Sequence, residues 1–463
     1  MDFNNQISRK RFLQMLGLGG MYLSSLGGKS RILGTPAPAP IVINLLLEGG
    51  PDLKHLFVPP VSADPASYGG NYWKFRASAQ EVDPVDVTAW QNRYNSDYVQ
   101  VARSGFTFGI LNRCGWLIDK FNAGNVAIIS NVIHSDTRDH ARSLLELQHG
   151  VIGAPTQGAA TVGWGGSLTQ NSGGQILSIT DQMRPFCNRP DGNRNLILSA
   201  NNTRNIGLYY EQDLTTTPDS TSPSAIMTRA MRSYYTRKSL LTGTVYQRFQ
   251  DSELRLRTLG DQVRNRLDAN PVPTAIENLS SGNTALNRRG FANQIRSVYD
   301  SFLCADIPGY DFRAMSLNYS GWDTHKRQRQ SMGDNLEDIF GTGKGLDALT
   351  SSLPAADNNR TVFVIAGEFG RQLRSNGDSG TDHGRGNYVI LIGNPVLGGV
   401  YGNMFPDSEI ANFSSFNKDT VGLTSLQQIL GKVCDWHSGS GNIVFPGYAT
   451  TAIEPGLNLA GLI

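Results

Sequence analysis

The sequence predicts an α/β fold with a central, largely parallel sheet. Short apolar runs rich in β-branched residues alternate along the chain with segments whose apolar spacing is typical of helices. The apolar runs are nearly continuous, which indicates strands that are covered on both faces. Strands that alternate with helices in this way are typical of parallel sheets.

The first predicted strands are IVINLLL at 41–47 and VAIISNV at 126–132. The segment ARSLLELQHG follows the second strand, and its leucine spacing and closing glycine predict a helix that ends there. A long helix is predicted after Gln328. The remaining strands are predicted in three later apolar runs: DFRAMSLNY at 311–319, RTVFVIAG at 360–367 and YVILIG at 388–393.

The predicted domain covers residues 41–463, and 463 residues are ample to bury a large core. A change in composition and patterning marks 153–290 as a predicted cap or insertion made of helices and loops. Within it, TTTPDSTSPS at 215–224 has the composition of a linker. The segment 226–267 is helical and basic on one face, and we interpret that face as solvated rather than as a surface for an anionic ligand or partner.

Residues 1–34 are interpreted as an export signal. They contain SRKRFL, which resembles the Ser-Arg-Arg-x-Phe-Leu pattern of twin-arginine signals with Lys10 in place of the second arginine. A modest apolar run rich in glycine follows, too short for a membrane span. The expectation is a periplasmic or otherwise exported protein that uses the twin-arginine export machinery. The alternative is a disordered basic tail.

Charge and cysteine content argue against several classes of protein. The 41 basic and 39 acidic residues leave a net charge of +2, so no overall field favours nucleic acid as a partner. The four cysteines, at 114, 187, 304 and 434, form no Cys-x-x-Cys pair, which argues against a zinc knuckle or a thioredoxin-like site. We expect them to be buried or structural, and any pairing among them is open.

Acidic and histidine side chains follow the predicted strands, at the edge of the sheet where ligands bind in open α/β folds. Each has a structural alternative: Asp52 could cap a turn, Asp323 could begin the next helix, Glu368 could pair with Arg371, and the GTDHG segment could close a turn. The strand-end residues singled out as metal ligands are Asp52, Asp323, His325, Glu368, Asp382 and His383.

This set of side chains suits hydrolysis that depends on a divalent metal. Carboxylate oxygens and neutral imidazoles bind zinc, manganese and similar ions, and two ions about 3.5 to 4 Å apart can hold both the attacking and the leaving oxygen. Glycines around His383 would let the backbone approach an ion closely. The metal is expected to be zinc, manganese, magnesium or calcium, and its identity is open.

The motifs EGGPD, GWDTH, GEFGR and GTDHGRGN…GGVYG, in this order, resemble an uncharacterised family of exported bacterial proteins with a domain of unknown function. That family is placed in the alkaline phosphatase and sulfatase superfamily. The resemblance covers about 41 to 410, and its most specific part is EFGR followed by GTDHG. It implies an alkaline-phosphatase-like fold, with a central mixed sheet flanked by helices and a metal site at one end.

The resemblance also implies roles for individual residues. Asp52 matches the acid after the first strand that binds one metal, Asp323 and His325 match the ligands of the other, and His383 matches the late histidine that joins them. The superfamily has an Asp-His pair where this chain has Glu368 followed by phenylalanine. Asp382, His140 or another group would have to replace that imidazole, so one metal, an altered pair or no metal is expected.

The nucleophile implied by the superfamily is a hydroxyl or modified cysteine at the start of the helix after the second strand. The segment HSDTRDHARS offers Ser135, Thr137 and Ser143 there, and we favour Thr137. Arg138 or Arg142 would hold a phosphate or sulfate oxygen, and His140 would assist. The alternative is that this segment only caps the helix that it opens.

Two functions are therefore expected. The first is an exported metal-dependent hydrolase that cleaves a phosphate or sulfate ester, either a small anionic ester or one carried on a polymer. The second is an exported binding or assembly protein that keeps the fold but has lost catalysis, which the Glu368-Phe369 pair and the lack of a clear nucleophile favour.

Overall fold

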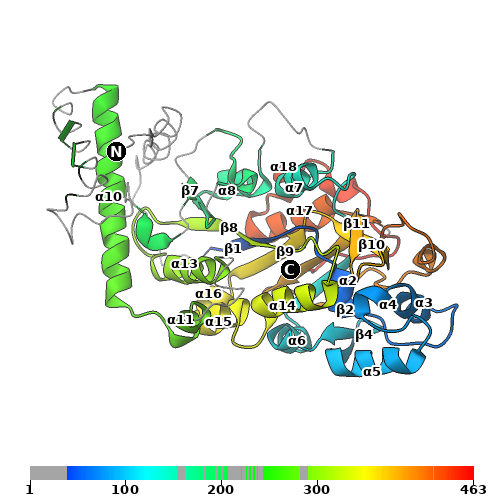
Figure 1. Cartoon of the computed structure of the whole chain (residues 1–463). Coiled ribbons are helices and arrows are strands. Elements are labelled where there is room, and N and C mark those ends of the chain that lie inside the picture. Colours follow the sequence, from blue (N-terminus) through cyan, green and yellow to red (C-terminus); the bar gives the residue numbers. More distant parts are fainter. Residues whose placement is uncertain are drawn as a thin grey trace, which may run out of the picture.

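The protein is described from a computed structural model and is built on one central sheet (Figure 1). The structure describes residues 39–463 except 154–161, 181–182, 193–196, 200–201, most of 207–242, 282–289 and 421. The sheet has nine strands in the order β13-β5-β12-β9-β1-β8-β6-β7, with β14 paired to β5. Their bounds are β1 Ile41–Glu48, β5 Val126–Ile133, β6 Gln175–Ser178, β7 Ile197–Ser199, β8 Phe312–Ser320, β9 Thr361–Gly367, β12 Gly386–Ile392, β13 Gly399–Tyr401 and β14 Thr424–Ser425.

The sheet is largely parallel, as the sequence predicts. Strand β1 pairs in parallel with β8 and with β9, and β6 pairs in parallel with β7 and β8. Strand β12 is antiparallel to both β9 and β5, which makes the sheet mixed. All five predicted strands are confirmed, each to within two residues at its ends.

Helices cover both faces of the sheet (Figure 1) because successive side chains of a strand point to opposite faces. In β1, Ile43 and Leu45 enter one core and Val42 and Leu46 enter the other. One face is covered by α6 Gly115–Asn122, α11 Thr274–Leu279, α13 Phe291–Leu303, α14 Gln328–Phe340 and α15 Gly345–Ser352. The other is covered by α7 His140–His149, α8 Trp164–Ser172, α17 Leu426–Ser438 and α18 Gly441–Val444.

Two smaller sheets and several short helices extend one end of the molecule. Strands β2 Phe57–Val58, β4 Phe106–Leu111 and β3 Tyr98–Arg103 form one small sheet, and β10 Gly370–Ser375 pairs with β11 Thr381–Gly384 in the other. Beside them lie α2 Leu53–Leu56, α3 Tyr68–Phe75, α4 Ala77–Gln80 and α5 Val87–Asp97. The remaining short elements are α16 Ala355–Asn358 and the 3₁₀ turns Pro185–Cys187, Thr203–Asn205, Asp407–Asn412 and Tyr448–Thr450.

The range 153–290, predicted as a cap or insertion, supplies β6 and β7 to the central sheet. It also contains α10 Val245–Ala269, a helix of 25 residues that extends beyond the body of the molecule (Figure 1). Most of the predicted linker at 215–224 and all of the predicted export signal at 1–34 lie outside the described residues. Within the described part of the chain, no helix is long and apolar enough to cross a membrane.

The four cysteines are buried and unpaired. Their burial agrees with the expectation that they are buried or structural. Burial raises the pKa of the Cys187 and Cys304 thiols to about 12, so both are protonated at neutral pH. A protonated thiol is a poor nucleophile and a poor metal ligand.

Acid is expected to destabilise the fold below a pH of about 6.5. Burial lowers the pKa of His55, His134 and His437 to about 4, from an ordinary value of 6.5. Between these values the unfolded chain binds protons on these rings and the folded chain does not, so the free energy of unfolding falls as the pH falls. Each such histidine contributes about 1.4 kcal/mol per pH unit.

One buried acid opposes this effect. Burial raises the pKa of Asp300 from 3.8 to about 6, so the folded state gains a proton there before the unfolded state does. Below pH 6 the unfolded state is therefore expected to bind about two more protons than the folded state, and this difference sets how steeply the free energy of unfolding depends on pH. Urea unfolding at several pH values measures it, and His437→Gln should reduce the dependence of the free energy of unfolding on pH below pH 6 by about one proton. A free energy of unfolding that does not change between pH 7 and 5 would contradict this account.

Candidate functional site

Several loops meet at one edge of the central sheet. The carboxyl ends of β1 and β8 pair through Glu48 and Ser320, and β1 ends beside Gly367 of β9. Strand β12 runs the other way and begins at Gly386, which pairs with Ile133 at the end of β5. The segment before β12 therefore reaches the same edge as the segments that follow β1, β5, β8 and β9.

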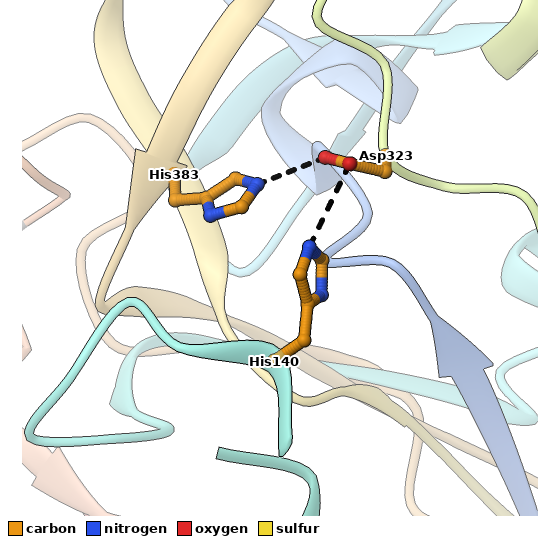
Figure 2. A group of neighbouring side chains, drawn as sticks. All are labelled: His140, Asp323 and His383. Carbon is orange, nitrogen blue, oxygen red and sulfur yellow. Dashed lines mark hydrogen bonds and ion pairs between the residues drawn. The ribbon is translucent and has the colours of Figure 1, made fainter. Parts of the chain in front are cut away.

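Three side chains from these segments face one another there (Figure 2). His383 Nε2 lies 2.8 Å from Asp323 Oδ1, and His140 Nε2 lies 3.6 Å from Asp323 Oδ2. Each residue offers one ligand atom, and these three atoms lie within 4.8 Å of one another. Asp323 follows β8, His383 belongs to β11, and His140 is the first residue of α7.

A third histidine joins this group. His325 Nε2 lies 3.1 Å from Asp323 Oδ1 and 3.0 Å from His383 Nε2. We call His140, Asp323, His325 and His383 the histidine cluster. It brings together three of the six residues that were predicted as metal ligands, with His140 as the additional imidazole.

Each ring of the histidine cluster is held through its Nδ1 atom. His140 Nδ1 lies 2.8 Å from Glu368 Oε1, and His325 Nδ1 lies 2.9 Å from Asp382 Oδ1. His383 Nδ1 lies 3.0 Å from the backbone carbonyl oxygen of Arg138. Because a carbonyl or carboxylate oxygen accepts, each Nδ1 carries the proton in the neutral ring, and each Nε2 then presents a lone pair toward Asp323. A ring that gains a second proton donates from Nε2 to Asp323 instead.

This arrangement leaves two imidazole lone pairs facing each other, at His325 and His383. Two acceptors 3.0 Å apart repel unless a proton or a cation lies between or beside them. Histidines that bind metals have the same pattern, in which one ring nitrogen donates to a carboxylate or carbonyl while the other is the ligand. The donor set therefore fits a divalent cation, and protons are the competing occupants.

The electrostatic environment of the histidine cluster is dominated by carboxylates. The hydrogen bond to Glu368 raises the pKa of His140. Burial lowers the pKa of His383, against the effect of its hydrogen bond to Asp323. Burial of Asp323 would raise its pKa, but hydrogen bonds from His383 and Arg371 outweigh this and lower the pKa to about 2. Asp323 is therefore an anion at neutral pH.

Arg371 holds the loops that carry this cluster. Its guanidinium donates to the backbone oxygens of Gly49, Gly50, Trp322 and Thr381, at 2.6 to 2.9 Å, and to Asp323 Oδ1 at 2.9 Å. Arg371 therefore pairs with Asp323. The structural alternative for Glu368, an ion pair with Arg371, is not found among the described residues. Nothing in the residue spacing indicates these carbonyl contacts, so the sequence did not predict the role of Arg371.

Phe369 occupies the position where the resemblance implies a histidine. Its ring centroid lies 4.9 Å from that of His140 and 4.5 Å from that of His383. The ring also fills the space beside Gly50, where an added Cβ would lie 2.1 Å from Phe369. An apolar ring in this place offers no ligand, which favours one cation over a pair.

Asp52 lies in a different environment from the one predicted. Its buried carboxylate forms an ion pair with Arg76 and accepts a hydrogen bond of 2.6 Å from Gln328 Nε2. Within the described part of the chain, no hydrogen bond or ion pair joins Asp52 to the histidine cluster. Its side chain does not cap α2 either, although it precedes that helix.

Glu368 and Asp382 lie next to the histidine cluster and orient its rings. Glu368 Oε1 also accepts a hydrogen bond of 2.8 Å from the backbone nitrogen of Gly49, and its buried Oε2 has no hydrogen-bond partner among the described residues. Asp382 Oδ1 accepts a second hydrogen bond, of 3.1 Å, from Asn376 Nδ2. Both acids were predicted as metal ligands. Their contacts indicate instead that they orient the rings of His140 and His325.

The segment around Thr137 forms the start of α7. Asp139 caps the helix, because its side chain accepts from the backbone nitrogen of Arg142, and Thr137 Oγ1 accepts from the backbone nitrogen of Asp139 at 3.2 Å. Ser135 donates to the buried Glu146 at 2.6 Å. The segment thus has the capping role that was the alternative for it, and neither hydroxyl has a described contact with the histidine cluster.

The arginines of this segment are held by acids. The Arg138 side chain pairs with Asp419, and Arg142 pairs with Asp136 at 2.8 Å. An arginine that is already paired is a weak clamp for an anionic oxygen, because it must first leave its partner. Arg138 instead contributes through its backbone carbonyl, which orients His383.

Comparison with known proteins identifies the family. Residues 39–412 match the family described as "Protein of unknown function (DUF1501)", which is most of the chain, so the protein belongs to this family. The match begins just before β1 and ends with the 3₁₀ turn at Asp407–Asn412, so it includes the whole histidine cluster. No curated protein matches the chain.

Proposed function

We propose that this protein binds one divalent cation at the histidine cluster and uses it to hydrolyse a phosphate or sulfate ester. The observation that carries the proposal is the shared orientation of three imidazoles. Each is anchored through Nδ1 and turns Nε2 toward the Asp323 carboxylate. A metal bound there would act as a Lewis acid on the ester and lower the pKa of a bound water.

The residues of the chain have separate parts in this proposal. His140, Asp323, His325 and His383 hold the cation, and Arg371 fixes Asp323 between the three rings. The attacking group in the proposal is a water molecule rather than Thr137, whose hydroxyl faces its own turn. The alkaline-phosphatase-like fold, the twin-arginine signal and an exported or periplasmic location remain parts of the same proposal and rest on the sequence resemblance.

The first test is the cation content of the purified full-length chain. After removal of metal with a chelator, the protein is dialysed separately against zinc, manganese, magnesium and calcium, and bound ions are counted by elemental analysis. About one ion per chain is expected, because Phe369 offers no ligand for a second. A protein that retains none of the four ions would refute the metal site and the hydrolase together.

The second candidate function is an exported binding protein that has lost catalysis. Phe369 beside His140 and His383 favours it, because an apolar ring takes the place of an expected ligand. The two candidates differ in turnover. A panel of aryl and sugar phosphates and sulfates is assayed with each loaded ion, and hydrolysis that disappears in His383→Ala supports the hydrolase. One bound ion with no turnover on any ester supports the binding protein.

A further inference from the structure

A cavity of about 400 Å3 lies beside the histidine cluster, between α3, α4 and the β10–β11 hairpin. Ligand pockets in proteins range from roughly 300 to 1,000 Å3, so a molecule with one ring fits this volume. The cavity is lined by residues of three segments, among them Lys74, Phe75, Arg374, Asn376 and Phe416.

The lining carries two cations and no acid. Lys74 and Arg374 both line the cavity, and neither forms an ion pair with a carboxylate among the described residues. Among the described residues, Arg374 has one hydrogen bond, from Nη1 to the backbone oxygen of Ser414 at 2.8 Å, which leaves other guanidinium donors available there. Two cations without counter-charges attract an anionic group, and Arg matches the oxygens of a sulfonate or phosphonate in two-point contacts.

Aromatic rings accompany these cations. The Arg374 guanidinium lies 4.0 Å from the ring centroid of Phe416, and Lys74 Nζ lies 5.3 Å from that of Phe75. The Phe416 side chain is 58% exposed, which is unusual for a phenylalanine and leaves part of its ring available for contact. Stacking on Phe416 also fixes the arginine in place, which reduces the entropy lost when an anion binds.

We propose that this cavity is a second binding site, which takes an aromatic anion. The anionic group lies between Lys74 and Arg374, and the ring packs against Phe416. The site is distinct from the histidine cluster and does not depend on the proposed hydrolysis. The two sites are neighbours, because Asn376 lines the cavity while its side chain donates to Asp382, the acid that orients His325.

The test is a titration of the full-length, cation-free protein with benzenesulfonate and benzenephosphonate, followed by calorimetry or ligand NMR. Saturable binding is expected for both, and much weaker binding for methanesulfonate, which lacks the ring, and for benzyl alcohol, which lacks the charge. Arg374→Gln and Phe416→Ala should each weaken binding by about 10-fold. The control Lys120→Gln removes a lysine that also lies near an aromatic ring, Trp116, and should change nothing.

A further variant separates the two sites. His383→Ala should leave the affinity for benzenesulfonate unchanged, because His383 does not line the cavity. Binding that is lost in His383→Ala but kept in Arg374→Gln would place the anion at the histidine cluster and overturn the proposal. No saturation of either probe by about 10 mM would overturn it as well. Neither result bears on cation binding, which the elemental analysis measures separately.

Discussion

Replacing Asp323 with alanine is expected to lower the affinity of the protein for a divalent cation by more than about 100-fold and to abolish any ester hydrolysis. Asp323 is the carboxylate toward which three imidazole Nε2 atoms turn, at 2.8, 3.1 and 3.6 Å. Its loss removes the anion that offsets the charge of the cation. Loss of a supporting residue typically costs 10- to 100-fold, so loss of a ligand should cost more.

Two companion variants give this prediction its controls. Asp378→Ala removes a nearby acid that is exposed and pairs loosely with Lys326 at 3.8 Å, so cation affinity should not change. Glu368→Gln keeps the shape of the side chain that anchors His140 but removes its charge, and should weaken binding by about 10- to 100-fold. Calorimetric titration with zinc or manganese measures all three. Equal affinity in the wild-type protein and Asp323→Ala would refute the site.

The strands and their common edge could be predicted from the sequence because both follow from local patterns. A continuous apolar run such as 41–47 has few alternatives to a buried strand. Parallel strands then bring their carboxyl ends to one edge, which places Asp323 and Glu368 near each other without further information. His383 reaches the same edge for a different reason, because β12 is antiparallel and therefore begins where its neighbours end.

The partners of each side chain could not be predicted in the same way. Asp52 pairs with Arg76, which lies 24 residues away across α2 and α3, and no periodic pattern links the two. Arg138 pairs with Asp419, 281 residues away, and this occupies its guanidinium. His383 is oriented by a backbone carbonyl, a group that every residue carries. The partner that each side chain contacts depends on its tertiary neighbours. The sequence therefore predicts the residue types of the site better than their roles.

Of the substitutions proposed here, breaking the buried ion pair between Asp52 and Arg76 is expected to lower the free energy of unfolding most. Asp52 and Arg76 are 2% and 1% exposed, and the guanidinium has one other described acceptor, the backbone oxygen of Gln372 at 3.4 Å. Asp52→Asn keeps the shape of the side chain but leaves the buried Arg76 without its ion-pair partner. Removal of one partner of a buried pair costs about 3 to 5 kcal/mol, which urea unfolding measures directly.

Two variants test whether the cost comes from the uncompensated charge. Arg76→Met alone should destabilise the fold by a similar amount, since it leaves the carboxylate without its cation. The double variant with Asp52→Asn should be less destabilised than the sum of the single changes, because neither charge then remains buried alone. Asp334→Asn is the matched control, as it breaks an exposed pair with Arg113 and should cost less than about 1 kcal/mol.

The same variants decide whether Asp52 is structural or a ligand. If its role is the ion pair with Arg76, Asp52→Asn lowers the free energy of unfolding while the folded protein keeps the wild-type affinity for zinc or manganese. Asp323→Ala should behave in the opposite way, with a large loss of affinity and a smaller loss of stability, because Asp323 is half exposed and the buried Arg371 keeps its four backbone acceptors. A fall of more than about 100-fold in the cation affinity of folded Asp52→Asn would return Asp52 to the ligand set, because loss of a group that only supports a ligand typically costs about 10- to 100-fold. The two acids therefore separate stability from cation binding in one pair of measurements.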